Sequence, residues 1–203
     1  MKKVYQIGLL MPFLIACSPK QQTKDCLITD SLAEYRDTIV GNFSGLGIDT
    51  LISEPIDSLS VPEFDGDHFG NQHYKWRVFS KSGRIKDLII KDTNGIQLVY
   101  EGDLDGNGTD EWGFRTQWAV SNWHTYQIHT YHNGEWYYLS KPIMLFASDF
   151  EELKNGLYVA EPNETKGLIN IKFSRVQDGG FCVVDTTINA SFIPISDNVD
   201  CIF

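Results

Sequence analysis

Short apolar runs broken by turn-forming residues are the feature that most constrains the fold of this 203-residue chain. From Ile39 onward, stretches rich in Val, Ile, Tyr, Trp and Phe alternate with Gly, Asn, Asp and Pro. This pattern predicts antiparallel strands joined by turns. The expected strands cover residues 48–53, 74–80, 85–91, 96–101, 111–120, 124–132, 135–140, 157–161, 168–176, 180–186 and 189–194.

Two shorter signals refine this prediction. Asn133-Gly134 lies between two expected strands, and Asn-Gly suits the type I′ turn of a two-residue hairpin. Ser148 is followed three residues later by Glu151, a capping box that predicts one short helix at residues 149–154. The expected fold is therefore all-β, with antiparallel blade-like sheets and at most one short helix.

The N-terminus has the composition of an export signal. Lys2 and Lys3 precede an apolar run over residues 7–16, which is too short to cross a bilayer as a stable helix. The run ends in Leu14-Ile15-Ala16-Cys17, which resembles the bacterial lipobox. That resemblance implies cleavage before Cys17 and acylation of this residue, and several acyl chains anchor a protein firmly. The alternative is a soluble secreted protein with a chance cysteine near its cleavage site.

Three segments are expected along the chain: a signal peptide at residues 1–16, a lipidated cysteine and polar tether at 17–38, and a single β domain at 39–203. The expected location is the bacterial cell envelope, and Ser18 after the cysteine is compatible with lipid anchoring in the outer membrane. The formal charge is −10, and it becomes −12 without residues 1–16, which hold two lysines and no acids. No basic stripe is visible, so nucleic acid is excluded as an expected partner.

Three cysteines remain if Cys17 is acylated: Cys26, Cys182 and Cys201. Exported proteins can hold disulfides, so one bridge and one free thiol are expected. Cys182–Cys201 is the favoured pair because both lie in the C-terminal β region, and the other pairings stay open.

An acidic stretch at residues 103–111 is the strongest candidate site. It places oxygen-bearing side chains at alternate positions around two glycines, which let the backbone fold tightly. A hard cation such as Ca²⁺ takes about six to eight oxygen ligands. The expected ligands are Asp103, Asp105, Asn107, Thr109 (through its carbonyl) and Glu111, with Asp110 as an alternative to the last. The competing interpretation is a β-turn whose Asp and Asn side chains bond their own backbone without a metal.

Residues 102–111 resemble the calcium loop of FG-GAP/VCBS-type repeats, the motif of the integrin α-subunit propeller. In that family the first, third, fifth and ninth positions give side-chain oxygens and the seventh gives its carbonyl. The resemblance therefore implies the ligand set named above, with Glu111 where aspartate is usual. The surrounding sequence is also similar to uncharacterised Bacteroidota lipoproteins. An EF-hand is disfavoured, because the twelfth place from Asp103 holds Phe114 and no flanking helices are expected.

Residues 42–51 align without gaps on residues 103–112, which suggests an internal repeat. The glycines at the fourth and sixth places match, as does the aspartate at the eighth. The first copy has Asn42, Ser44 and Leu46 where the second has metal donors. We interpret the pair as two copies of one turn, of which one can bind a cation. Two repeats are too few to close a propeller, which needs about four blades, so a sandwich or open packed sheets are expected.

The sequence carries no recognisable catalytic motif. It lacks a Gly-x-Ser-x-Gly elbow, a His-Glu-x-x-His helix and a phosphate-binding glycine loop. Strand alternation puts His124 and His132 on one face and His129 on the other. Eight residues of continuous strand separate the first two by about 26 Å, so they cannot share an ion. No catalytic residue is assigned.

Aromatic residues are concentrated in the middle of the chain. Core packing is the expected role for most of them. The alternative is an exposed platform for a glycan or a protein partner, formed by Trp118, Trp123, Tyr126 and Trp136. The leading functional prediction is a non-enzymatic binding or scaffold module attached to the membrane by its lipid anchor. The alternative is an envelope glycan hydrolase, which would need two carboxylates about 5–9 Å apart in a deep cleft.

Overall fold

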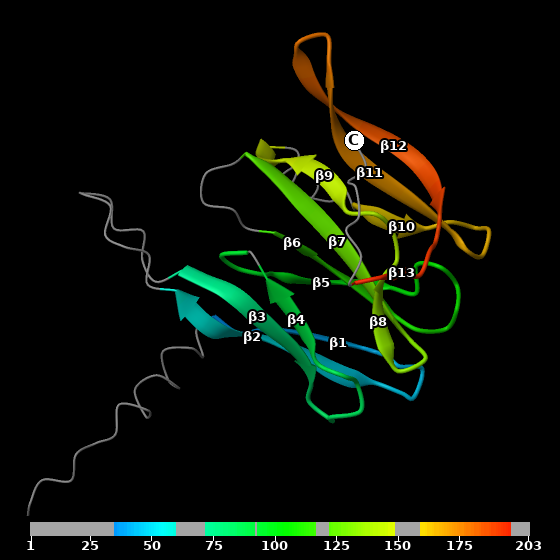
Figure 1. The fold of residues 1–203 in the computed structure, drawn as a ribbon. Coiled ribbons are helices and arrows are strands. Elements are labelled where there is room, and N and C mark those ends of the chain that lie inside the picture. The colour runs from blue at the N-terminus through cyan, green and yellow to red at the C-terminus, as the bar shows by residue number, and fades with distance from the viewer. Residues whose placement is uncertain (1–34, 60–71, 92, 117–121, 149–158, 196–203) are drawn as a thin grey trace, which may run out of the picture.

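The computed structural model describes residues 35–59, 72–91, 93–116, 122–148 and 159–195. Within these ranges the chain forms thirteen strands, arranged in three open antiparallel sheets (Figure 1). The predicted all-β fold with open sheets is thus confirmed. The signal peptide, the lipidated Cys17 and the helix expected at 149–154 lie outside the described residues.

The first sheet, sheet A, is formed by the N-terminal strands in the order β1-β2-β3-β4. Its strands are β1 (Asp37–Gly41), β2 (Asp49–Leu59), β3 (Gln72–Ser80) and β4 (Leu88–Lys91). β1 begins at Asp37, two residues before the expected start of the domain. β1 and β4 are the edges of this sheet within the described part of the chain.

The second sheet, sheet B, has the strand order β13-β8-β7-β6-β5, and β9 pairs with the other end of β7. Its strands are β5 (Leu98–Gly102), β6 (Glu111–Arg115), β7 (Trp123–His132), β8 (Glu135–Tyr138), β9 (Ile143–Phe146) and β13 (Ile193–Pro194). The third sheet, sheet C, consists of β10 (Ala160–Pro162), β11 (Leu168–Gln177) and β12 (Gly180–Asn189).

Sheet B is the middle layer, with sheet A on one face and sheet C on the other (Figure 1). One core packs strands of sheets A and B together, and it includes Trp76, Leu88, Trp112 and Trp136. A second core packs sheets B and C, and it includes Tyr126. Because both faces of sheet B are covered, β6 is buried at four successive positions instead of alternating between core and solvent.

The predicted β7–β8 hairpin is confirmed. His132 pairs with Glu135, so the loop between them has two residues. Asn133 and Gly134 have φ angles of 51° and 86°. A type I′ turn requires positive φ at both positions, and Asn-Gly meets that requirement at low cost.

Candidate metal site at the junction of three hairpins

The loop between β5 and β6 folds three carboxylates together. Gly106 and Gly108 have φ angles of 72° and 95°, a left-handed conformation that glycine adopts freely. These bends turn Asp103, Asp105 and Glu111 toward a common point, where one oxygen of each lies within 4.8 Å of the others. In the part of the chain that the structure describes, these three side chains form a group of acidic residues close enough together to hold a metal ion.

Glu111 is the most buried member of this group. Its side chain has no exposed surface, while Asp105 is 5% exposed. The N–H of Leu104 and the hydroxyl of Thr130 each donate to its carboxylate at 2.8 Å. Burial raises the pKa of Glu111 to about 8, because desolvation outweighs those two hydrogen bonds, and the nearby aspartates raise it further. A cation at this point would favour the ionised form.

The two aspartates also stabilise the turn itself. The N–H of Asn107 donates to Oδ1 of both Asp103 and Asp105 at 2.9 Å, and the N–H of Gly108 donates to Asp103 Oδ2 at 2.9 Å. These are the backbone bonds of the metal-free interpretation. A carboxylate oxygen has a second lone pair after accepting one such bond, so the turn and a metal site are compatible.

Asn107 and Thr109 are hydrogen-bonded to each other. The Asn107 side-chain oxygen accepts from the Thr109 N–H at 2.7 Å and from its hydroxyl at 2.5 Å. The Asn107 amide nitrogen donates to Asp105 Oδ2 at 3.0 Å. The structure therefore brings together the three carboxylates among the five predicted ligands. Asn107 lies beside them, but it faces Asp105 with its amide nitrogen and not with its oxygen.

Asp110, the alternative ligand, faces sheet A. Its Oδ2 accepts from the Asn42 N–H at 2.5 Å, and its own N–H donates to the Asn42 carbonyl at 3.1 Å. The side-chain amide of Asn42 also donates to the carbonyl of Gly108 at 3.2 Å. Asp110 thus joins the loop to the β1–β2 turn, which leaves Glu111 as the acid that completes the cluster.

The same loop is also hydrogen-bonded to sheet C. The N–H of Gly167, in the β10–β11 turn, donates to the carbonyl of Asp105 at 2.8 Å. Gly106 packs against Lys166 in that turn, and a Cβ added there would lie 3.4 Å from the Lys166 side chain. The loop at residues 103–110 therefore contacts hairpins from both other sheets.

The β1–β2 turn at residues 42–48 repeats part of this geometry with a guanidinium beside it. Gly45 and Gly47 have φ angles of 73° and 103°, as at the matching places of the second turn. The guanidinium of Arg84 donates to the carbonyls of Leu46 and Ile48 at 2.9 Å, and it lies 3.6 Å from the Asp49 carboxylate. Ile48 matches Thr109, whose carbonyl is an expected metal ligand. Here the chain supplies a positive charge of its own.

Two of the four residues of the predicted aromatic platform are buried. Tyr126 and Trp136 are 1% and 6% exposed, because sheets A and C cover both faces of the strands that carry them. Trp123 is partly exposed and packs edge-on against Phe146 and Phe181 at centroid distances of 5.3 and 5.6 Å. Trp118 lies outside the described residues.

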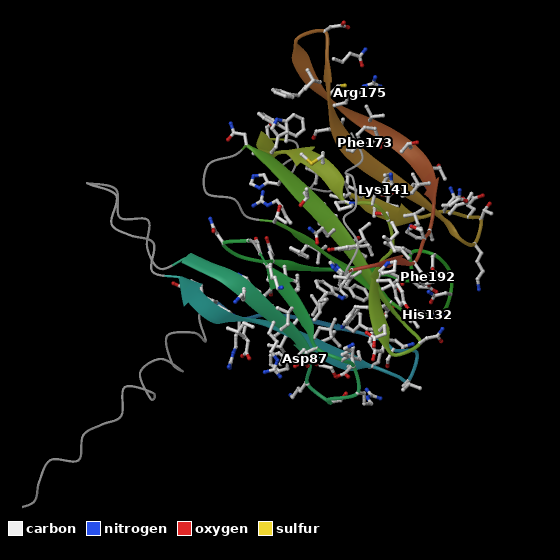
Figure 2. The ribbon with its side chains drawn as sticks, in the orientation of Figure 1. Asp87, His132, Lys141, Phe173, Arg175 and Phe192 are labelled. Atoms are coloured by element: carbon white, nitrogen blue, oxygen red, sulfur yellow. The ribbon has the colours of Figure 1, made fainter. Side chains whose placement is uncertain are left out.

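The three clustered histidines lie apart, as alternation on a continuous β7 predicts. His129 is buried, and its ring stacks on Trp112 with centroids 4.5 Å apart. His124 is bonded to the carbonyl of Thr116 at 2.9 Å. His132 is exposed and lies beside Phe192, with centroids 4.8 Å apart (Figure 2).

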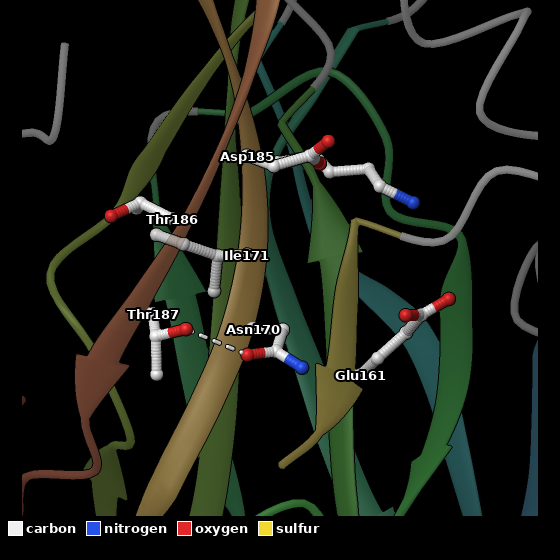
Figure 3. A pocket seen from close by; sticks show the side chains of 7 residues that line it. Glu161, Asn170, Ile171, Asp185, Thr186 and Thr187 are labelled. Carbon is white, nitrogen blue, oxygen red and sulfur yellow. Dashed lines mark hydrogen bonds between the residues drawn. The ribbon is translucent and has the colours of Figure 1, made fainter.

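A polar hollow of about 370 Å³ lies on sheet C (Figure 3). Glu161 and Asp185 line it from the two outer strands, and Asn170 on the strand between them accepts from the Thr187 hydroxyl at 2.8 Å. Two strand spacings, or about 10 Å, separate the backbones of the two acids. They are also offset by two residues in register. The hollow therefore gives no specific support to a hydrolase with a close carboxylate pair.

Sequence reasoning missed the residues outside the loop that hydrogen-bond its acids, Thr130 on Glu111 and Asn42 on Asp110. It also missed Arg84, which stabilises the matching β1–β2 turn. All three are distant in sequence, and strand pairing brings them to their places. The thiol of Cys182 is free in this structure, which does not support the Cys182–Cys201 bridge. Cys26 and Cys201 lie outside the described residues.

Comparisons with protein-family models, with curated proteins and with solved structures gave no match for this chain. No helix among the described residues has the length and apolar composition needed to span a bilayer.

Proposed function

We propose that this chain is a lipid-anchored, non-enzymatic binding or scaffold module of the bacterial cell envelope, and that Ca²⁺ in the loop at residues 103–111 holds its sheets together. The observation that carries this proposal is the cluster of Asp103, Asp105 and Glu111. Its oxygens lie within 4.8 Å of one another in a loop that is hydrogen-bonded to hairpins of both other sheets.

Calcium is the cation that fits these donors best. The cluster offers oxygen atoms only, which favours a hard cation over zinc or copper. An irregular loop suits Ca²⁺ better than Mg²⁺, because Mg²⁺ demands near-ideal octahedral geometry. The resemblance to the FG-GAP/VCBS calcium loop supports the same ion.

A structural role follows from the position of the cluster. The loop supplies all three carboxylates, and Glu111 is fully buried, so little room is left for a substrate. A cation here would neutralise three carboxylates at the point where the β1–β2, β5–β6 and β10–β11 hairpins meet. Anything that binds the folded state alone stabilises it by mass action.

The decisive measurement is a thermal melt of residues 18–203 in excess Ca²⁺ and in excess chelator. We expect a higher melting temperature with Ca²⁺, and we expect Asp105→Ala to abolish that difference. The matched control is Asp185→Ala, which removes an exposed acid from sheet C and should leave the Ca²⁺ response intact. Equal melting temperatures for the unmutated chain in both buffers would remove calcium from the proposal.

A further inference from the structure

A cavity of about 440 Å³ lies between strand β4, at the edge of sheet A, and residues of strands β7 and β8 in sheet B. All four residues of β4 line one side of it. On the sheet B side the lining residues are Gln127, His129 and Tyr138. Ile195 also lines the cavity. A cavity of this size is in the range of ligand-binding sites.

The β4 side of the cavity is a strand edge. β4 pairs with β3 on one side only within the described part of the chain. Leu88 and Ile90 are buried whereas Ile89 and Lys91 are exposed, yet all four line the cavity. The cavity therefore runs along the backbone of β4, where an edge strand presents N–H and C=O groups to any incoming chain.

The opposite wall contains a buried polar atom without a partner. His129 is 1% exposed and its Nδ1 has no hydrogen bond. A neutral imidazole ring has one donor and one acceptor nitrogen, so Nδ1 can pair with a backbone N–H or with a backbone C=O of an incoming chain. Burial lowers the pKa of His129 to about 3, which keeps the imidazole neutral at physiological pH. A polar atom left unsatisfied in a buried place costs free energy that a hydrogen bond to a ligand would recover.

The remaining groups define the chemistry of that ligand. Tyr138 brings a hydroxyl and Gln127 a side-chain amide, while Leu88, Ile90 and Ile195 form an aliphatic wall. A peptide unit has the matching donor and acceptor, and it can also continue the hydrogen-bond ladder of β4. The exposed Lys91 in the cavity lining supplies a positive charge on a protein with a net charge of −10.

We propose that this cavity binds an extended peptide with an acidic end, which adds to β4 as a further strand and hydrogen-bonds His129 Nδ1 through a backbone group. The acidic end lies at Lys91 and aliphatic side chains face Leu88 and Ile90. The inference rests on the binding role proposed above and names its partner class, but it does not require the calcium loop.

The test is a selection of displayed random seven-residue peptides against residues 18–203, followed by affinity measurements on the synthetic winners. We expect peptides with alternating aliphatic residues and at least one acid. N-methylation at alternate backbone positions should abolish binding, since it removes the donors of a β ladder. His129→Phe keeps an aromatic ring but removes the polar ring nitrogen, and we expect about tenfold weaker binding.

Lys91→Glu tests the rim without disturbing the core, because Lys91 is exposed. We expect it to weaken binding several-fold at low salt and less at high salt. The matched control is Lys141→Glu, an exposed lysine that does not line the cavity, which should bind as the unmutated chain does. If His129→Phe fails to fold, the comparison of Lys91→Glu with Lys141→Glu still tests whether the peptide binds in this cavity.

Three results would overturn the inference: no enriched peptide, equal binding to Lys91→Glu and to the control, or binding that is insensitive to N-methylation. A crystal soaked with a selected peptide that shows only an ordered water on His129 Nδ1 would also overturn it. Repeating the measurements in chelator separates the two proposals. Peptide binding without any effect of Ca²⁺ on the melting temperature would support the peptide site and rule out the proposed calcium site.

Discussion

Glu111 is the residue at which burial and charge conflict most strongly. In chelator, we expect the free energy of unfolding to fall as pH rises from about 4.5 to about 8. The pKa of Glu111 is about 8 in the folded protein against an ordinary 4.5, so its contribution is complete below 4.5 and is lost through 8. The change is a few kcal/mol at about 1.4 kcal/mol per pKa unit. Ca²⁺ should oppose it by stabilising the carboxylate.

Urea unfolding at pH 5, 6.5 and 8 measures this slope, and Glu111→Gln should flatten it. Glu101 is the matched control, because burial raises its pKa to about 7 although it is hydrogen-bonded to Tyr126. Glu101→Gln should remove a separate part of the slope, between about 4.5 and 7, and should keep the Ca²⁺ response. An unchanged slope in Glu111→Gln would show that its carboxyl does not titrate as its burial implies.

The sequence predicted the convergence of acids at this site, because alternating donors around two glycines specify a tight loop within nine residues. It placed Glu111 in the ligand set and left Asp110 as the alternative, and the structure has Glu111 in the cluster. The choice between these two acids depends on hydrogen bonds from Asn42 to Asp110 and from Thr130 to Glu111, contacts that only strand pairing creates. Tyr126 and Trp136 of the expected surface platform are buried for a similar reason. Alternation along β7 shows two faces, but it does not show that a second sheet covers the outer one.

At the scale of elements, the first of the two matching turns has Arg84 as its positive charge, whereas a metal ion is only proposed for the second. We expect Arg84→Ala to destabilise the chain by about 1–2 kcal/mol, since it leaves the carbonyls of Leu46 and Ile48 without their donor. The loss should be the same in Ca²⁺ and in chelator. Arg84→Lys should restore only part of it, because an ammonium cannot bridge two carbonyls as a planar guanidinium does.

Urea unfolding in both buffers measures this effect, with Arg36→Ala as the control. Arg36 forms an exposed ion pair with Glu54 at 2.9 Å, and pairs of that kind contribute little. An Arg84→Ala loss that appears only in chelator would mean that Ca²⁺ also occupies the first turn.

Strands with a clear alternating or turn-bounded pattern were predicted well, and short ones were missed. The β7–β8 hairpin follows from Asn133-Gly134 alone. β1 has only two large apolar residues in five, and β9 is an unbroken apolar run of four. Neither gives a period that distinguishes a strand from a loop or a buried turn. Their positions are set by pairing with β2 and β7, which is tertiary information.

For the whole molecule, the sequence predicts all-β sheets but not their order in space. Placing sheet B between sheets A and C requires β6 and β7 to be buried on both faces. Their sequences show this only weakly, because Glu111 and Thr130 interrupt the apolar pattern inside the covered region. The Thr130 hydroxyl donates to Glu111, so each of these buried polar groups has a partner inside the covered region. The three-layer arrangement thus buries one member of the carboxylate cluster completely.

The proposed membrane anchor is a property of the whole chain, and one substitution tests it. We expect the full-length protein, expressed in a bacterium with lipoprotein processing, to partition into the detergent phase of a Triton X-114 extract. Cys17→Ala removes the acylation site and should move it to the aqueous phase, because no other apolar anchor is expected after residues 7–16. Cys26→Ala is the matched control and should stay in the detergent phase. Detergent partitioning by Cys17→Ala would contradict lipid anchoring at this cysteine, whereas the Ca²⁺ response of the domain should be the same with or without the acyl chains.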